Sequence, residues 1–198
     1  MPQAKGLDRR VARTRRSLAE ALISLSSEFG YDRVTIREVT ERADVGYATF
    51  FRHFRSKDEL ATYCIRAASV KFMNAVQSAE TLHEESLALY RALHENRDVC
   101  LFGLSLPREH PALAPVWEEI THWMMELYSA RQGTEIPLEL SLNHLINSVV
   151  ELFRWWLTDG QDYSIEQMAL MQSDLVVKVT ETVALDHRLK SPRDAVPD

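Results

Sequence analysis

The sequence predicts an all-α fold, and three observations support this. Apolar residues recur at intervals of three and four, as on one face of a helix, over most of the 198 residues. Helix N-terminal signatures precede several of these segments, for example Thr35 followed by Glu38 and Ser164 followed by Gln167. No stretch shows the alternation of apolar and polar residues that is typical of a half-buried strand. We therefore expect helices packed on helices throughout the chain.

The first eighty residues predict four helices. The first helix ends at Gly30, and the second is short and capped by Thr35. A turn at 44–46 separates the second helix from the third, which covers 47–54. The fourth is long, begins at the capping box Ser56-Lys57-Asp58-Glu59 and runs to about Ala79.

The remainder of the chain predicts five more helices and a short tail. The helices run from Thr81 to near Asn96, from Val99 to Leu106, from Pro111 to about Gln132-Gly133, from Pro137 to Asp159-Gly160, and from Ser164 to about His187. Residues 191–198 contain two prolines and no apolar pattern, which predicts a disordered tail.

Composition narrows the class of protein further. The apolar fraction of 45% is sufficient for a packed core and does not favour disorder. The longest uncharged apolar stretch, Val99 to Leu106, is too short to span a bilayer, and the N-terminus has no apolar segment of a signal peptide. Two cysteines build neither a disulfide framework nor a cysteine-rich zinc site. We expect a cytosolic protein without membrane association.

The charge is distributed unevenly along the chain. Residues 1–57 carry 12 basic and 7 acidic side chains, a net charge of +5, and residues 58–198 carry 11 basic and 22 acidic, a net charge of −11. The basic side chains gather in the first helix, at Lys5, Arg9, Arg10, Arg13, Arg15 and Arg16. This asymmetry indicates that the N-terminal end contacts a polyanion, although a solvated helix without a partner is an equal alternative.

The two short helices and their three-residue turn are typical of a helix-turn-helix. Its inward positions are Ile36, Val39, Ala43, Val45, Phe50 and Phe54, and its outward positions on the third helix are Tyr47, Ala48, Thr49, Phe51, Arg52 and His53. The outward face has hydroxyl, guanidinium and imidazole groups and no acidic residue, which suits a DNA major groove. On periodicity alone, a helical hairpin that binds nothing stays open.

The residues from Val34 to Leu60, VTIREVTERADVGYATFFRHFRSKDEL, resemble the DNA-binding signature of TetR/AcrR-family transcriptional regulators. The match extends from about Arg9, includes Phe29-Gly30-Tyr31, and is most specific over residues 49–60. The resemblance implies a helix-turn-helix domain at 1–60, a helical effector-binding and dimerisation domain at 61–190, and the tail at 191–198. The second domain resembles the family only loosely.

The resemblance also implies which residues contact DNA. The positions that hold the DNA backbone are Thr35, Thr49, His53 and Lys57, and those near base edges are Arg37, Tyr47, Ala48 and Arg52. Three residues depart from the family pattern. Phe51 replaces a Tyr that contacts phosphate, Asp44 replaces a turn Gly, and Gly46 replaces a Ser-like N-cap.

In this family the C-terminal helices usually enclose a small-molecule pocket, and the last two form the dimer interface. The candidate pocket residues are Phe102, Trp117, Met124, His144 and Asn147. The alternative for the apolar members is ordinary core packing. The alternative for His144 and Asn147 is a solvated face or the dimer contact.

These patterns together predict a homodimeric repressor that a small, largely apolar ligand releases from a palindromic double-stranded DNA operator. The alternative is a helical protein-interaction module whose helix-turn-helix no longer binds DNA. An enzyme is disfavoured because the sequence has neither a phosphate-binding loop nor a nucleophile–base signature. We expect no cofactor. The sequence does not favour a metal site at Glu118 and His122. It also does not favour a thiol sensor at Cys64 or Cys100.

Overall fold

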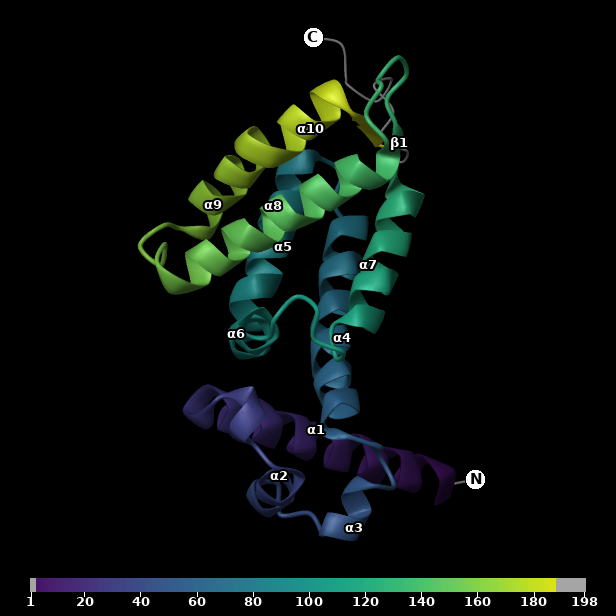
Figure 1. Cartoon of the computed structure of the whole chain (residues 1–198), viewed down its shortest axis with the longest axis vertical. Coiled ribbons are helices and arrows are strands. Elements are labelled where there is room, and N and C mark those ends of the chain that lie inside the picture. The colour runs from purple at the N-terminus through teal and green to yellow at the C-terminus, as the bar shows by residue number, and fades with distance from the viewer. Residues whose placement is uncertain (1–2, 188–198) are drawn as a thin grey trace. The chain divides into compact units, whose positions relative to one another are not determined.

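The computed structural model describes residues 3–187, so the predicted tail at 191–198 lies outside the described residues. The described chain is almost entirely helical, which confirms the predicted all-α class (Figure 1). It divides into two compact units. The first contains the residues up to Ala68 together with Asp98–Val116, and the second contains Ser69–Arg97 together with the residues from Trp117. Each unit is thus made of two separate segments of the chain, whereas the sequence predicted one division after residue 60. That division stays a prediction.

The first unit is built on a long N-terminal helix. Its elements are α1 (Gln3–Phe29), the 3-10 turn η1 (Tyr31–Arg33), α2 (Ile36–Arg42), α3 (Tyr47–Phe50), the first half of α4 (Lys57–Gln77), and α6 (Arg97–Ser105) from Asp98 on. The helix α2 packs against both α1 and α3. Leu18, Leu22, Val39, Phe50 and Leu60 are fully buried and form the centre of this unit.

The second unit contains the rest of α4 and the remaining elements. These are α5 (Leu82–Glu95), α7 (Ala114–Leu127) from Trp117 on, β1 (Tyr128–Ala130), α8 (Leu138–Thr158), α9 (Ile165–Gln172), the π-helical turn η2 (Ser173–Val177), α10 (Lys178–Val183) and β2 (Leu185–His187). The helix α9 packs against α5 and α8. One core cluster of this unit consists of Val76, Met124, Leu127, Tyr128, Leu142, Leu145, Ile146, Val176, Val177, Ala184 and Leu185.

The predicted capping boxes are largely confirmed. At Thr35, Thr81 and Ser164 the side-chain oxygen accepts from the backbone N–H three residues later, and the third residue's side chain accepts from the cap N–H. At Ser56 only half of the box forms. The Glu59 N–H donates to Ser56 Oγ at 3.1 Å, whereas the Glu59 carboxylate accepts from the N–H of Arg55 at 2.6 Å.

The expectation of no strand is wrong at one place. The antiparallel strands β1 and β2 pair Tyr128 with His187 and Ala130 with Leu185, so α7 and α10 end earlier than predicted. Tyr128 and Leu185 are buried in this ladder. Because the partners are far apart in the sequence, neither three-residue segment carries a strand signal of its own.

The other differences concern helix ends. The regular helix α3 ends at Phe50 rather than Phe54, and hydrogen-bonded turns continue it, with the N–H of Phe54 donating to the carbonyl of Phe50 at 2.9 Å. The helix α7 begins at Ala114, and Pro111 lies in the turn before it. Among the described residues, no helix combines the length and the apolar character that crossing a membrane requires.

Candidate nucleic-acid interface

The inward face of α3 and the turn after it fixes the helix to its neighbours. Phe50 and Phe54 are buried, their ring centroids lie 5.9 Å apart, and Phe54 lies 5.4 Å from Tyr63 of α4. The guanidinium of Arg15, on α1, lies 5.6 Å from the Phe54 ring centroid in a cation–π contact. The helices α1 and α4 thus contact Phe54, and α2 packs against α3. Phe50 and Phe54 are buried, as the sequence pattern predicted, whereas the contact with α4 was not predicted.

The turn before α3 has the geometry that its residues predicted. Asp44 adopts a left-handed conformation with φ of 51°, and the Val45 N–H donates to the Thr40 carbonyl at 2.9 Å. Gly46 is the N-cap of α3 and supplies no side-chain acceptor. The first N–H groups of α3 consequently have no side-chain cap.

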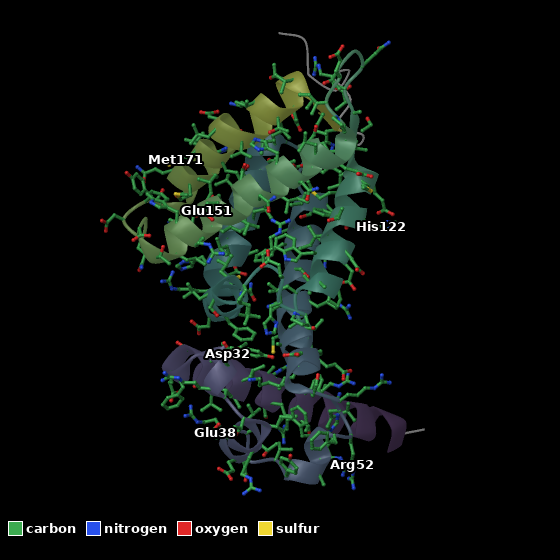
Figure 2. All side chains as sticks on the ribbon, in the orientation of Figure 1. Asp32, Glu38, Arg52, His122, Glu151 and Met171 are labelled. Carbon is green, nitrogen blue, oxygen red and sulfur yellow. The ribbon has the colours of Figure 1, made fainter. Side chains whose placement is uncertain are left out.

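The outward face of the α3 region is exposed and has no acidic side chain. Tyr47 and Phe51 are 52% and 47% exposed, and their rings pack edge to face with centroids 5.3 Å apart. Ala48 and Arg52 are also exposed, and Thr49 is half-buried. Figure 2 shows Arg52 extending from the α3 region into solvent. Among the described residues, the Arg52 side chain has neither an ion pair nor a hydrogen bond, so its guanidinium is available for a base edge or a phosphate.

Two predicted DNA contacts lie at the N-terminus of α2. Arg37 is exposed, with no ion-pair partner among the described residues. Thr35, in contrast, is engaged inside the protein: its hydroxyl donates to the carboxylate of Glu38 at 2.7 Å and accepts the Glu38 N–H at 3.3 Å (Figure 2 labels Glu38). The hydrogen bonds from Thr35 lower the pKa of Glu38, which keeps this carboxylate charged. Thr35 must share or exchange its hydroxyl proton to contact phosphate.

Lys57, at the start of α4, is also engaged internally. Its Nζ donates to the carbonyls of Tyr31 at 2.7 Å and Val34 at 2.8 Å, and it lies 4.1 Å from the Tyr31 ring centroid. Burial lowers the pKa of this ammonium. Two of its three N–H groups therefore join α4 to η1, and only the third remains for a phosphate.

His53 is half-buried beside the guanidinium groups of this surface. Burial lowers its pKa, and the charges of Arg15 and Arg52 lower it further. The imidazole of the free protein is therefore neutral at pH 7 and has one N–H to donate.

Two internal contacts that support this surface were not predicted from the sequence. The buried Tyr31 hydroxyl donates to Asp58 Oδ1, and the Tyr31 ring packs against His110 and Phe102 with centroids 5.0 and 5.8 Å away. The side chains of Arg42 and Glu28 join α2 to α1 through two hydrogen bonds of 2.7 and 3.0 Å. Tyr31 belongs to the stretch that resembles the family, but no local signal pairs Glu28 with Arg42.

The candidate pocket residues fall in both units. Phe102 is in the first unit, against Tyr31, and Trp117, Met124, His144 and Asn147 are in the second. Met124 belongs to the core cluster and the partly buried Trp117 packs against it, whereas His144 is exposed on α8 and Asn147 is half-buried. A shared pocket for these five side chains stays a prediction.

The metal and thiol alternatives receive no support from local geometry. His122 is exposed on α7 (Figure 2), and its Nε2 lies 3.5 Å from Oε1 of Glu126. Within residues 3–187, no group of three or more His, Cys, Asp or Glu side chains is arranged to hold a metal ion. Cys64 and Cys100 are buried, and burial raises the pKa of Cys64 to about 12, so this thiol is protonated and unreactive at neutral pH.

A helix-turn-helix whose outward face is exposed and has a guanidinium without an internal partner is typical of a DNA-binding protein, and comparisons with known proteins identify its kind. Residues 18–64 match the model of the family described as "Bacterial regulatory proteins, tetR family". The HTH-type transcriptional regulator TcmR of Streptomyces glaucescens is 36% identical over 153 residues, which cover 68% of each chain. The uncharacterized HTH-type transcriptional regulator YxbF of Bacillus subtilis (strain 168) is 32% identical over 175 residues, or 83% of this chain, which spans only 45% of YxbF.

Solved structures agree with this result. The crystal structure of a TetR transcriptional regulator from Streptococcus agalactiae superposes with a TM-score of 0.62 at 25% identity, covering 87% of this chain and 98% of the other. This chain belongs to the TetR family of transcriptional regulators, and its first unit contains their DNA-binding helix-turn-helix.

Proposed function

We propose that the protein is a homodimeric, sequence-specific repressor that a small-molecule effector releases from a palindromic operator. The observation that carries this proposal is the exposed surface of the α3 region, where the Arg52 side chain has no internal partner among the described residues. Phe50 and Phe54 are buried on the opposite, inward side of the α3 region and hold this surface in place. Such a surface can enter a major groove without breaking internal contacts.

An unpartnered apolar face supports the dimer. On α9, η2 and α10, four exposed apolar side chains follow one another about a turn apart, namely Leu170, Leu175, Val179 and Val183. Leu140 of α8 is 60% exposed and adds to the apolar surface of this unit. A second copy that covers this face would bury it. The dimer would also place two α3 helices in successive major grooves, about 34–36 Å apart.

Effector release requires that the ligand bind one conformation better than the other. A ligand with equal affinity for the DNA-bound and free conformations shifts no equilibrium, however tightly it binds. The helix α4 contributes residues to both units and is therefore the segment through which we expect a change to pass. We propose that this occurs in the cytoplasm, where bacterial DNA lies.

The test is recovery of operator DNA from sheared genomic DNA at near-physiological salt, followed by sequencing of what stays bound. A few enriched sites that share one palindrome would support the proposal, with Arg52→Ala protein as the matched control. Uniform or absent enrichment would contradict it. In that case the exposed aromatic pair Tyr47 and Phe51 would favour the protein-interaction alternative, because exposed aromatic side chains are enriched at protein interfaces.

A further inference from the structure

Among the described residues, the buried polar groups of the second unit that have no hydrogen-bond partner include one on α5 and one on α9. Tyr90 of α5 is 0% exposed and Gln172 of α9 is 1% exposed. Neither the Tyr90 hydroxyl nor the Gln172 side-chain oxygen has a hydrogen-bond partner among the described residues. Buried polar groups almost always have partners, so two such groups on packed helices indicate that something else supplies the hydrogen bonds.

The two groups belong to the same part of the interior. The helices α5 and α9 pack against each other, and Gln172 Nε2 lies 3.4 Å from the hydroxyl of Ser86. Ser86 is one helical turn before Tyr90 on the same face of α5. Since side chains of a helix lean towards its N-terminus, we expect the Tyr90 ring to lie on the side of its turn that faces Ser86.

The missing hydrogen bond does not depend on how the Gln172 amide is oriented. The Ser86 hydroxyl can either donate or accept, so it satisfies whichever end of the amide faces it. In both orientations the other end has no partner. Because burial raises the pKa of Tyr90, its phenol is protonated at neutral pH and can donate a hydrogen bond.

The ring contacts of Tyr90 are with aromatic, uncharged side chains. Its ring contacts Phe153 and Trp156 of α8 edge to face, with centroids 5.3 and 5.2 Å away. Phe72 of α4 lies 6.2 Å from Phe153, and the indole N–H of Trp156 is already used by the Tyr163 carbonyl at 2.9 Å. A ligand here would meet aromatic faces and edges, and an ionised group would lose its hydration without gaining an opposite charge from these side chains.

We propose that Tyr90 and Gln172 together bind the hydroxyl group of an uncharged aromatic ligand whose ring lies against Phe153 and Trp156. A hydroxyl group both donates and accepts, so one group on the ligand satisfies Tyr90 and Gln172 together. The inference rests on the proposed function only in that this ligand would be the effector. The binding itself does not depend on DNA.

The test is isothermal titration calorimetry of the full chain with phenol, 2-naphthol and 9-phenanthrol. Each compound is compared with its parent hydrocarbon, benzene, naphthalene or phenanthrene, and 2-naphthol is also compared with anionic 2-naphthoate. At least one hydroxylated compound should bind roughly tenfold or more tightly than its parent, since the parent leaves both protein groups without partners. The affinity for 2-naphthoate should be lower than that for 2-naphthol.

The variants Tyr90→Phe and Gln172→Leu separate a ligand-binding role from a structural one. Tyr90→Phe should reduce the affinity of the hydroxylated compound to that of its parent, a loss of roughly tenfold. The same variant should keep or raise the thermal midpoint, because it removes a buried hydroxyl that has no partner. Gln172→Leu should likewise weaken binding of the hydroxylated compound and leave that of its parent unchanged. Tyr163→Phe, which removes an exposed hydroxyl, is the matched control and should change neither the affinity nor the thermal midpoint.

Three results of the binding measurements would overturn the inference. They are equal affinities for hydroxylated and parent compounds, unchanged affinity in Tyr90→Phe, and absence of binding by all three hydroxylated compounds. A crystal structure in which only an ordered water contacts Tyr90, in the presence of the compounds, would overturn it as well. Binding that depends on Tyr90 but does not weaken operator binding would support this site and contradict only the effector part of the proposed function.

Discussion

At the scale of single residues, the protein separates side chains that are free to contact DNA from those that are already engaged. Arg37 and Arg52 are exposed without internal side-chain partners among the described residues, whereas Thr35 and Lys57 each make two or more internal hydrogen bonds. The family signature marks all four as DNA contacts, Thr35 and Lys57 at the backbone and Arg37 and Arg52 near base edges, but it does not show how each side chain is used in the free protein. We therefore expect Arg37 and Arg52 to contribute most to binding, and Thr35 and Lys57 mainly to hold the local structure.

Arg52→Ala tests the base-reading role directly. We expect operator affinity to fall by about 1–3 kcal/mol, with relaxed preference at one base position. Binding to random DNA should change much less. Fluorescence anisotropy on the operator and on a scrambled duplex measures both. Equal loss on the two duplexes would assign Arg52 to phosphate contact alone.

His53 predicts a pH dependence of DNA binding. Its pKa in the free protein is lowered, and a nearby phosphate would raise it in the complex, so binding takes up a proton. Operator affinity should therefore increase as the pH falls from about 7.5 towards about 6, through the ordinary titration range of histidine. His53→Gln should flatten this dependence, and His122→Gln, at an exposed site in the second unit, is the matched control. Parallel pH profiles for the wild type and His53→Gln would contradict a phosphate contact.

At the scale of elements, the contacts between α1 and α2 support the recognition helix α3, because α3 packs against α2. Glu28 accepts hydrogen bonds from Arg42 and Ser24, which lower its pKa to about 2. The side chains of Arg42 and Glu28 are partly exposed, at 41% and 43%, so solvent reduces the energy of this pair. Its value lies in orienting α2 through two parallel hydrogen bonds.

Glu28→Gln tests this contact through the pH dependence of stability. A carboxylate whose pKa is lowered from 4.5 to about 2 on folding stabilises the protein above pH 4.5, and this contribution is lost as the pH falls towards 2. Glu28→Gln should thus have a lower urea midpoint than the wild type at neutral pH, and the difference should shrink below pH 4.5. Glu20→Gln is the control and should differ little at either pH, because Glu20 is exposed on the same helix and its side chain has no hydrogen bond or ion pair among the described residues. A constant difference would contradict the assignment.

From α9 to β2, the apolar periodicity of the sequence does not reveal which face of the segment is buried. From α9 to β2 the buried positions recur every four residues, at Met168, Gln172, Val176, Thr180 and Ala184. A regular helix turns about 40° too far over each four-residue repeat, and the wider π-turn η2 offsets part of that drift. Because Gln172 and Thr180 are polar, the inward face did not stand out in the sequence.

At the scale of the whole molecule, the proposed dimer depends on the exposed apolar face. Leu175→Glu should yield a monomer by sedimentation velocity without loss of helix content, because the Leu175 side chain is 67% exposed. Operator affinity should fall by roughly tenfold or more, since each half-site then binds independently. Val70→Glu, on α4 with 41% exposure, is the matched control and should remain dimeric. A dimeric Leu175→Glu protein would place the interface elsewhere.

The sequence by itself determined the all-α class, the capped helix starts, the left-handed Asp44 and the family, because each depends on a few neighbouring residues. The pairing of Tyr128 with His187, the pairing of Glu28 with Arg42 and the burial of Tyr90 beside α8 were decided only by the tertiary structure. These contacts join residues far apart in the chain. Their energies depend on distance and burial, which no local pattern encodes.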